Sequence, residues 1–275
     1  MREVDLTAAD GFTLRANVYD AGSDAVMLIA SALGVKRRYY DAFAQRIAAS
    51  GRTVVTFDYR GIGDSRPQSL RRFDGTMEEW GRLDITAAID WISAELRPRV
   101  LSYVGHSCGG QLLGLAPNAQ RIDRIIFTCA QSGYWRNWPG VRAYGIGALW
   151  LAMPVIANLA GYFPSKLLGL GSEDLPRRVA AEWARWGRHR DYLFGYNDPA
   201  PYTKITAPLL AWSFADDTYA PRTAVDALLR HYSAAAITRR HANAPGTGHF
   251  GFFRRNVGER FWEEAVTWLD APAMR

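Results

Sequence analysis

Short apolar runs alternate along the chain with longer segments in which apolar side chains recur at helical spacing. A run that is apolar throughout is typical of a strand buried on both faces of a sheet. Strands are therefore predicted at residues 25–30, 53–57, 100–104, 124–129 and 208–214, with a last strand at 237–241. Helices are predicted at residues 38–50, 77–96, 221–232 and 252–269. This alternation indicates an α/β fold with a mostly parallel central sheet flanked by helices.

The N-terminal residues follow a different pattern. Residues 3–8 and 12–19 alternate between apolar and polar positions, which is typical of half-buried strands. They are joined by Ala9-Asp10-Gly11, and an Asp-Gly pair favours a tight hairpin turn. The sequence thus predicts an N-terminal antiparallel hairpin.

Residues 131–204 interrupt the alternation of strands and helices and hold five of the ten tryptophans. We interpret them as a helical, aromatic-rich cap inserted into a core formed by residues 1–130 and 205–275. Within the cap, residues 143–165 carry no charged side chain and are about long enough to cross a bilayer. A span there would put the strands before and after it on opposite sides of a membrane. We therefore expect a pair of short helices broken at Pro154, with peripheral contact with lipid as the less favoured alternative.

The net charge of +6 comes from 30 arginines and three lysines, which are spread over the whole chain. Because there is no basic tail and no nucleic-acid-binding motif, this distribution argues against binding of nucleic acid. Two cysteines, Cys108 and Cys129, are too few for a disulfide framework or a metal cluster, so we expect no metal and no cofactor. The N-terminus has no apolar signal region, which favours a cytoplasmic location.

A short motif between the strand at 100–104 and a helix-forming run from Gln111 indicates a candidate catalytic residue. It reads Gly-His-Ser-Cys-Gly at residues 105–109. The pattern G-x-S-x-G between a strand and a helix is typical of a nucleophile elbow, which exposes the hydroxyl of Ser107 at the carboxyl end of a buried strand. The alternative is a glycine-rich turn that binds phosphate at the helix N-terminus.

A serine nucleophile needs a base within hydrogen-bonding reach and an acid that orients the base. His249 lies in a glycine-flanked loop after the last predicted strand, so it is the preferred base, with His241 as the alternative. Asp217 follows the strand before that and is the preferred acid, with Asp216 as the alternative. The order Ser, Asp, His along the chain is the one expected for an α/β-hydrolase.

With these motifs the whole chain resembles the α/β-hydrolase superfamily. More narrowly, it is similar to a bacterial group of predicted α/β hydrolases related to serine-aminopeptidase-like and monoglyceride-lipase-like enzymes. The resemblance implies an α/β-hydrolase fold and a triad of Ser107, Asp217 and His249. The matching stretches are residues 34–40, 58–65, 105–111, 132–135, 161–164, 182–186 and 248–254.

The chain departs from these relatives after its third predicted strand, where they carry His-Gly. Counting back from Tyr39 aligns Ala30-Ser31 with that pair. The backbone N–H groups of Ala32 and Cys108 would then form the oxyanion hole, which does not depend on side-chain identity. A shift of one residue would make Leu33 the donor instead.

Aromatic side chains of the cap are expected to form an apolar ceiling over the serine. We therefore predict a hydrolase that cleaves carboxylic esters of small to medium apolar molecules through an acyl-enzyme. Amide or peptide cleavage and acyl transfer use the same triad and stay open, as does a ligand-binding sensor with a vestigial triad. The candidate substrate-binding residues are Tyr134, Trp135, Trp138, Trp183 and Trp186.

Overall fold

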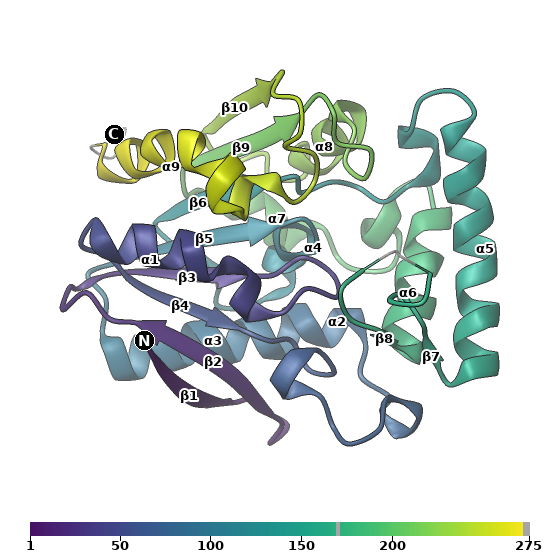
Figure 1. The fold of residues 1–275 in the computed structure, drawn as a ribbon, viewed down its shortest axis with the longest axis horizontal. Coiled ribbons are helices and arrows are strands. Elements are labelled where there is room, and N and C mark those ends of the chain that lie inside the picture. Colours follow the sequence, from purple (N-terminus) through teal and green to yellow (C-terminus); the bar gives the residue numbers. More distant parts are fainter. Residues whose placement is uncertain (169–170, 272–275) are drawn as a thin grey trace.

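The computed structural model describes residues 1–168 and 171–271. Within these residues, eight strands form one sheet in the order β1-β2-β4-β3-β5-β6-β9-β10 (Figure 1). The hairpin strands β1 (Arg2–Thr7) and β2 (Thr13–Tyr19) are antiparallel, and β2 is antiparallel to β4 (Thr53–Phe57). The other neighbouring strands are parallel. The predicted mostly parallel sheet with an antiparallel N-terminal hairpin is confirmed.

The parallel strands are buried where the sequence is apolar throughout. The edge strand β10 (Ile237–Ala242) is more polar and partly exposed, since among the described residues it pairs with β9 alone. Because parallel strands end at the same edge of the sheet, the loops that follow them are brought together there. In addition to β4 and β10, the strands that end at this edge are β3 (Ala25–Ala30), β5 (Val100–His106), β6 (Arg124–Thr128) and β9 (Leu209–Phe214).

Helices cover both faces of the sheet (Figure 1). On one face α1 (Asp41–Ala49) and α9 (Arg255–Asp270) pack against each other through edge-to-face contact of Phe43 with Trp262. On the other face lie α3 (Thr86–Trp91) and α8 (Arg222–Leu229). The helix predicted at 77–96 is continuous. It consists of α2 (Met77–Glu79), a π-helical turn (Trp80–Ile85), α3 and a second π-helical turn (Ile92–Leu96).

Residues 131–204 form a helical segment between β6 and β9. In Figure 1 its two long helices lie beyond the carboxyl ends of the parallel strands, and α5 is the outermost. The short strands β7 and β8 form a separate antiparallel pair. The elements of the helical segment are α5 (Arg142–Ala160), β7 (Tyr162–Phe163), β8 (Leu175–Pro176), α6 (Arg177–Arg188) and α7 (Ala200–Thr203).

The expected break at Pro154 is wrong, because α5 runs through it as one helix of 19 residues. A proline inside a helix has no N–H for the carbonyl four residues earlier, and that lost bond is part of its cost. Here the carbonyl of Trp150 accepts instead from the Arg188 guanidinium of α6, at 2.6 Å. A neighbouring helix therefore satisfies the group that the proline leaves without a partner.

Candidate active site

Ser107 lies in the turn that joins β5 to α4 (Cys108–Leu112). Its φ of 52° and ψ of −112° lie where non-glycine residues are rare, at a cost on the order of 1–3 kcal/mol. The turn is tight, since a Cβ at Gly109 would lie 2.4 Å from the carbonyl oxygen of Ala30. The helix begins directly after Ser107, earlier than the predicted start at Gln111.

Three buried tyrosines fix the orientation of α4. The last carbonyl groups of a helix have no partner within the helix and need other donors. Here tyrosine hydroxyls donate to three successive carbonyls, so the helix N-terminus is held beneath Ser107. The bonds are Tyr103 to Gly109 at 2.6 Å, Tyr232 to Gly110 at 2.7 Å and Tyr202 to Gln111 at 2.7 Å.

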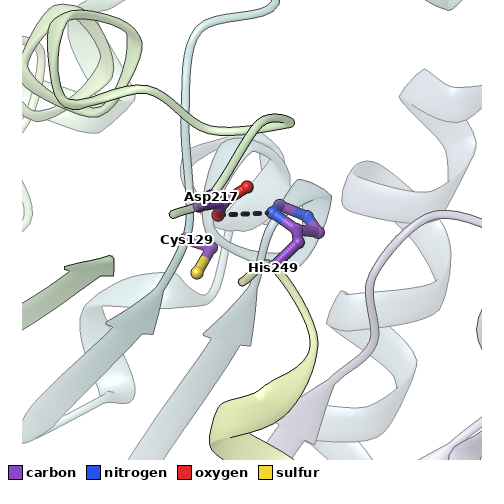
Figure 2. Close-up of side chains that lie close together, drawn as sticks. All are labelled: Cys129, Asp217 and His249. Atoms are coloured by element: carbon purple, nitrogen blue, oxygen red, sulfur yellow. Dashed lines mark hydrogen bonds and ion pairs between the residues drawn. The ribbon is translucent and has the colours of Figure 1, made fainter. Parts of the chain in front are cut away.

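The structure brings Asp217 and His249 together. His249 Nδ1 lies 2.8 Å from Asp217 Oδ2 (Figure 2). The other oxygen, Oδ1, accepts from the backbone N–H groups of Tyr219 and Ala220 at 2.8 and 2.9 Å. Burial by itself raises the pKa of Asp217, but the charge of His249 and hydrogen bonds from His249, Cys129 and Ala220 lower it below its usual value. Asp217 is therefore held as a carboxylate that orients the imidazole.

The alternative acid, Asp216, has a different set of partners. Its carboxylate accepts from the backbone N–H groups of Gly246 and Gly248 at 2.8 and 3.0 Å. Both glycines have positive φ, at 84° and 51°, a conformation that favours glycine. Asp216 thus holds the loop that leads into His249 without contacting its imidazole.

A buried hydrogen-bonded chain links His249 to the turn after β3. His106 Nε2 lies 2.9 Å from the backbone carbonyl oxygen of His249, and His106 Nδ1 lies 2.8 Å from the Tyr40 hydroxyl. The Tyr40 hydroxyl also accepts from the Ala32 N–H at 2.8 Å. Burial lowers the pKa of His106 to about 3, so the ring is neutral. Because a carbonyl only accepts, Nε2 carries the proton and Nδ1 accepts from Tyr40.

This chain corrects the expected oxyanion donor. The Ala32 N–H is already bonded to Tyr40, so Ala32 is wrong as the donor facing a substrate. Leu33, the alternative, lines the cavity at Ser107, and within the described residues its N–H has no hydrogen-bond partner. The count shifted by one residue, which names Leu33 as the donor, is therefore the one that this hydrogen bonding favours.

Cys108 supplies the other candidate N–H, at the first position of α4, where helix N–H groups have no partner within the helix. The Cys108 thiol is engaged elsewhere, since it donates to the carbonyl oxygen of Ser31 at 3.3 Å. Burial raises the pKa of the Cys108 thiol. A protonated, buried thiol is a poor nucleophile, so Ser107 stays the candidate nucleophile of the turn.

Ser107 and His249 line one cavity of about 150 Å³ beneath the helical segment. Its wall is mostly apolar and includes Ile146, Leu149 and Met153 from the inner face of α5. A dry cavity of about this size holds a guest such as benzene. The site therefore fits a short to medium apolar group next to the serine.

Only two of the five predicted substrate-binding aromatic residues, Trp138 and Trp183, line this cavity. Trp186 is fully buried and packs against Tyr192. Tyr134 and Trp135 lie at separate surface hollows, where Trp135 packs against Tyr144. The aromatic character of the segment was visible in the sequence, but its packing decided which rings face the serine.

A polar corner beside Ser107 was missed by the sequence reasoning. The Ser107 hydroxyl is directed at Gln131 Oε1, 3.5 Å away, and Gln111 Nε2 donates to the same oxygen at 3.2 Å. Tyr192 in turn donates to Gln111 Oε1 at 2.8 Å. Gln131 lies just after β6, so the rule that polar residues after parallel strands gather at one edge would have found it.

The alternative base, His241, lies outside the cavity that Ser107 lines. His241 bonds through Nδ1 to the Ser213 hydroxyl at 2.9 Å.

Ligand atoms of Cys129, Asp217 and His249 lie within 4.8 Å of one another, close enough to hold a metal ion. However, burial raises the pKa of the Cys129 thiol, and Asp217 already accepts from His249 and two backbone N–H groups. Both oxygens of the Asp217 carboxylate therefore already accept hydrogen bonds within the protein.

Comparison with known proteins gives one family. The model of the alpha/beta hydrolase family matches residues 27–259. The quorum-quenching protein AidA from Acinetobacter baumannii (strain MDR-ZJ06) is 32% identical, with the match covering 86% of this chain and 82% of AidA.

Solved structures share the fold at low sequence identity. The esterase Pf2001 from Pyrococcus furiosus is 15% identical with a TM-score of 0.63, and the match covers 98% of this chain and 91% of the esterase. Est816, described as an N-acyl homoserine lactone degrading enzyme, is 15% identical with a TM-score of 0.64, and the match covers 96% of this chain and 100% of Est816. These likenesses establish the α/β-hydrolase fold.

Proposed function

This chain belongs to the alpha/beta hydrolase family and is a hydrolase, and we propose that it cleaves carboxylic esters with Ser107 as nucleophile. The observation that supports this most is the placement of Ser107 at a strained turn in the same cavity as His249, whose Nδ1 is bonded to Asp217. Strain at a nucleophile elbow exposes the hydroxyl to a substrate. The remaining groups of the site have matching roles.

In this mechanism the carboxylate of Asp217 accepts a hydrogen bond from the N–H at His249 Nδ1, which leaves Nε2 with a lone pair as the base. The Ser107 hydroxyl has only a long bond to Gln131, at 3.5 Å, so turning it toward the base costs little. Ser107 attacks the ester carbonyl while His249 takes its proton. The N–H groups of Leu33 and Cys108 would bind the oxyanion, and His249 then protonates the leaving alcohol.

The acyl-enzyme is released by the same groups. His249 takes a proton from a water molecule that attacks the acyl carbon, and Ser107 recovers its proton as the acid product leaves. The helical segment acts as a cap, because its α5 side chains and Trp183 cover the serine and exclude bulk water. Hydrogen bonds to the developing charge are worth more in such a site than in water.

A panel of p-nitrophenyl esters tests the substrate class. The cavity of about 150 Å³ is expected to favour butyryl and hexanoyl esters over dodecanoyl ester by about tenfold or more in kcat/KM, because a longer chain cannot be enclosed. Stopped-flow absorbance should show a burst of nitrophenol equal to the enzyme concentration if deacylation is slower than acylation. Tight ester binding with no burst and no turnover would instead support a sensor with a vestigial triad.

A second candidate substrate is an N-acyl homoserine lactone. It is favoured by the 32% identity to a protein named for quorum quenching, over most of both chains. A lactone has the same acyl–oxygen bond as an ester, so the mechanism above would open its ring. Chromatography of N-hexanoyl homoserine lactone after incubation with enzyme distinguishes the products. Ring opening gives the N-acyl homoserine, whereas amide cleavage releases hexanoic acid and homoserine lactone.

The chain from His249 through His106 to Tyr40 predicts that a buried hydroxyl positions the site. Tyr40→Phe would leave the Ala32 N–H and His106 Nδ1 without hydrogen-bond partners. We expect this to lower the free energy of unfolding by about 1–3 kcal/mol. We expect kcat to fall about tenfold with little change in KM, because the turn after β3 and the His249 loop would both shift.

The matched control is Tyr19→Phe, which removes a hydroxyl bonded to Asp41 at 2.5 Å, away from the cavity. Both variants should unfold at lower temperature in a thermal melt, but only the Tyr40 variant should lose kcat. Equal kcat in the two variants would show that Tyr40 acts on stability alone.

A further inference from the structure

The outer side of α5 is an exposed apolar stripe. Four side chains at helical spacing point away from the protein: Tyr144 is 72% exposed, Leu151 64%, Val155 57% and Leu159 85%. We call these four residues the α5 outer face. The helix is apolar enough and long enough to cross a bilayer, and only 22% of its most apolar window is buried. Exposed apolar patches of this kind mark contact surfaces.

The inner face of the same helix packs against the rest of the protein. Leu149 and Met153 line the cavity, and Trp150 Nε1 donates to the carbonyl oxygen of Gly133 at 3.0 Å. Moving α5 into a bilayer as a span would pull these side chains out of the protein. The helix can therefore present its outer face to a partner only while it lies flat on the protein surface.

Two arginines without an acidic partner lie near the N-terminal end of α5. Between Arg124 and Glu173 the sequence has no Asp or Glu, and Arg136 and Arg142 lie near this end, whereas Lys166 beyond the other end is paired with Glu173 at 3.1 Å. Arg136 stacks over the Trp135 ring, and neither Arg136 nor Arg142 forms an ion pair within the described residues. At the other end, Arg71 stacks over the Tyr162 ring just after the helix.

We propose that the α5 outer face docks on the surface of an anionic lipid bilayer. An apolar helical face flanked by basic side chains buries its apolar residues among the lipid headgroups while the cations bind anionic lipid. The overall charge of +6 favours the same partner. A second copy of the chain fits less well, because pairing two such faces would bring their uncompensated cations together.

Docking would place the cavity directly behind the membrane-bound helix. Ile146, Leu149 and Met153 on the inner face of α5 would then be separated from the lipid by one helix diameter. An apolar substrate dissolved in the membrane would be concentrated near the site. This proposal does not depend on the ester or lactone assignment, since binding is measured without turnover.

Flotation of the purified full chain with vesicles tests the proposal. We expect co-flotation with vesicles of phosphatidylcholine and phosphatidylglycerol in a seven-to-three ratio, and at least tenfold weaker partition onto phosphatidylcholine alone. Leu151→Gln with Leu159→Gln should weaken partition onto the anionic vesicles by about tenfold or more. Hydrolysis of a soluble acetate ester by this double variant should be unchanged, which also shows that it is folded.

A charge-matched pair separates docking from general attraction. Arg136→Gln with Arg142→Gln should weaken partition about tenfold or more. Arg2→Gln with Arg255→Gln removes the same net charge at exposed positions on β1 and α9 and should have a much smaller effect. Equal losses in the two pairs, or no flotation of the unmodified chain, would overturn the proposal. So would a dimer in light scattering that the Leu151 and Leu159 changes convert to a monomer without any effect on flotation.

Discussion

Replacing Ser107 with alanine is expected to lower ester kcat by about 10⁶-fold while the protein stays folded. The alanine keeps the strained φ of 52° and the packing of the turn, so it removes the hydroxyl alone. Without that oxygen no acyl-enzyme forms, and only the catalysis provided by binding and the oxyanion donors persists. Steady-state kinetics and labelling by a fluorophosphonate probe measure the two losses, and circular dichroism checks the fold.

Ser102→Ala is the matched control for this prediction. Ser102 lies on the same strand, β5, and its buried hydroxyl has no hydrogen-bond partner within the described residues. That variant should label and turn over as the unmodified enzyme does. Full-rate labelling of the Ser107 variant, with Cys108 modified instead, would show that the nucleophile has been assigned to the wrong atom.

Asp217→Asn is expected to lower kcat by about 10⁴-fold. The asparagine oxygen can still accept from the N–H groups of Tyr219 and Ala220, which hold Oδ1 at 2.8 and 2.9 Å. Its amide NH₂ then faces His249 Nδ1, which must become an acceptor. The imidazole proton moves to Nε2, so the ring can no longer take the proton of Ser107. Kinetics measured alongside thermal unfolding separate this loss from a loss of stability.

Asp216→Asn changes the neighbouring carboxylate by the same atoms. Asp216 accepts from Gly246 and Gly248 rather than from the imidazole, and asparagine keeps one accepting oxygen. We expect a lower unfolding temperature and less than about a tenfold loss of kcat. If Asp216→Asn instead caused the larger loss of kcat, the roles of the two carboxylates would be reversed.

Several features followed from the sequence because they depend on local pattern. The apolar runs predicted the buried strands, and strands that run parallel must end at one edge. That rule placed Ser107, Asp217 and His249 near one another, and the structure shows the Asp217–His249 bond with Ser107 and His249 in one cavity. Their catalytic roles stay a prediction. The G-x-S-x-G spacing gave the strained turn, because small residues are needed where strand and helix pass closely.

Other expectations failed where a residue's state depends on a distant partner. Ala32 is ruled out as the oxyanion donor by the Tyr40 hydroxyl, a contact that counting along the chain does not reveal. α5 continues through Pro154, where Arg188 of α6 donates to the carbonyl that the proline leaves without its helical partner.

The sequence by itself determined the order of strands and helices, the elbow, and the loops that carry the candidate acid and base. Each depends on side-chain periodicity or on the conformations that glycine allows within a few residues. Only the tertiary structure decided which aromatic rings face the cavity, which N–H groups are free, and which side of α5 is left exposed. Those depend on packing between segments far apart in the chain, where an apolar or polar side chain finds its partner only once the fold has formed.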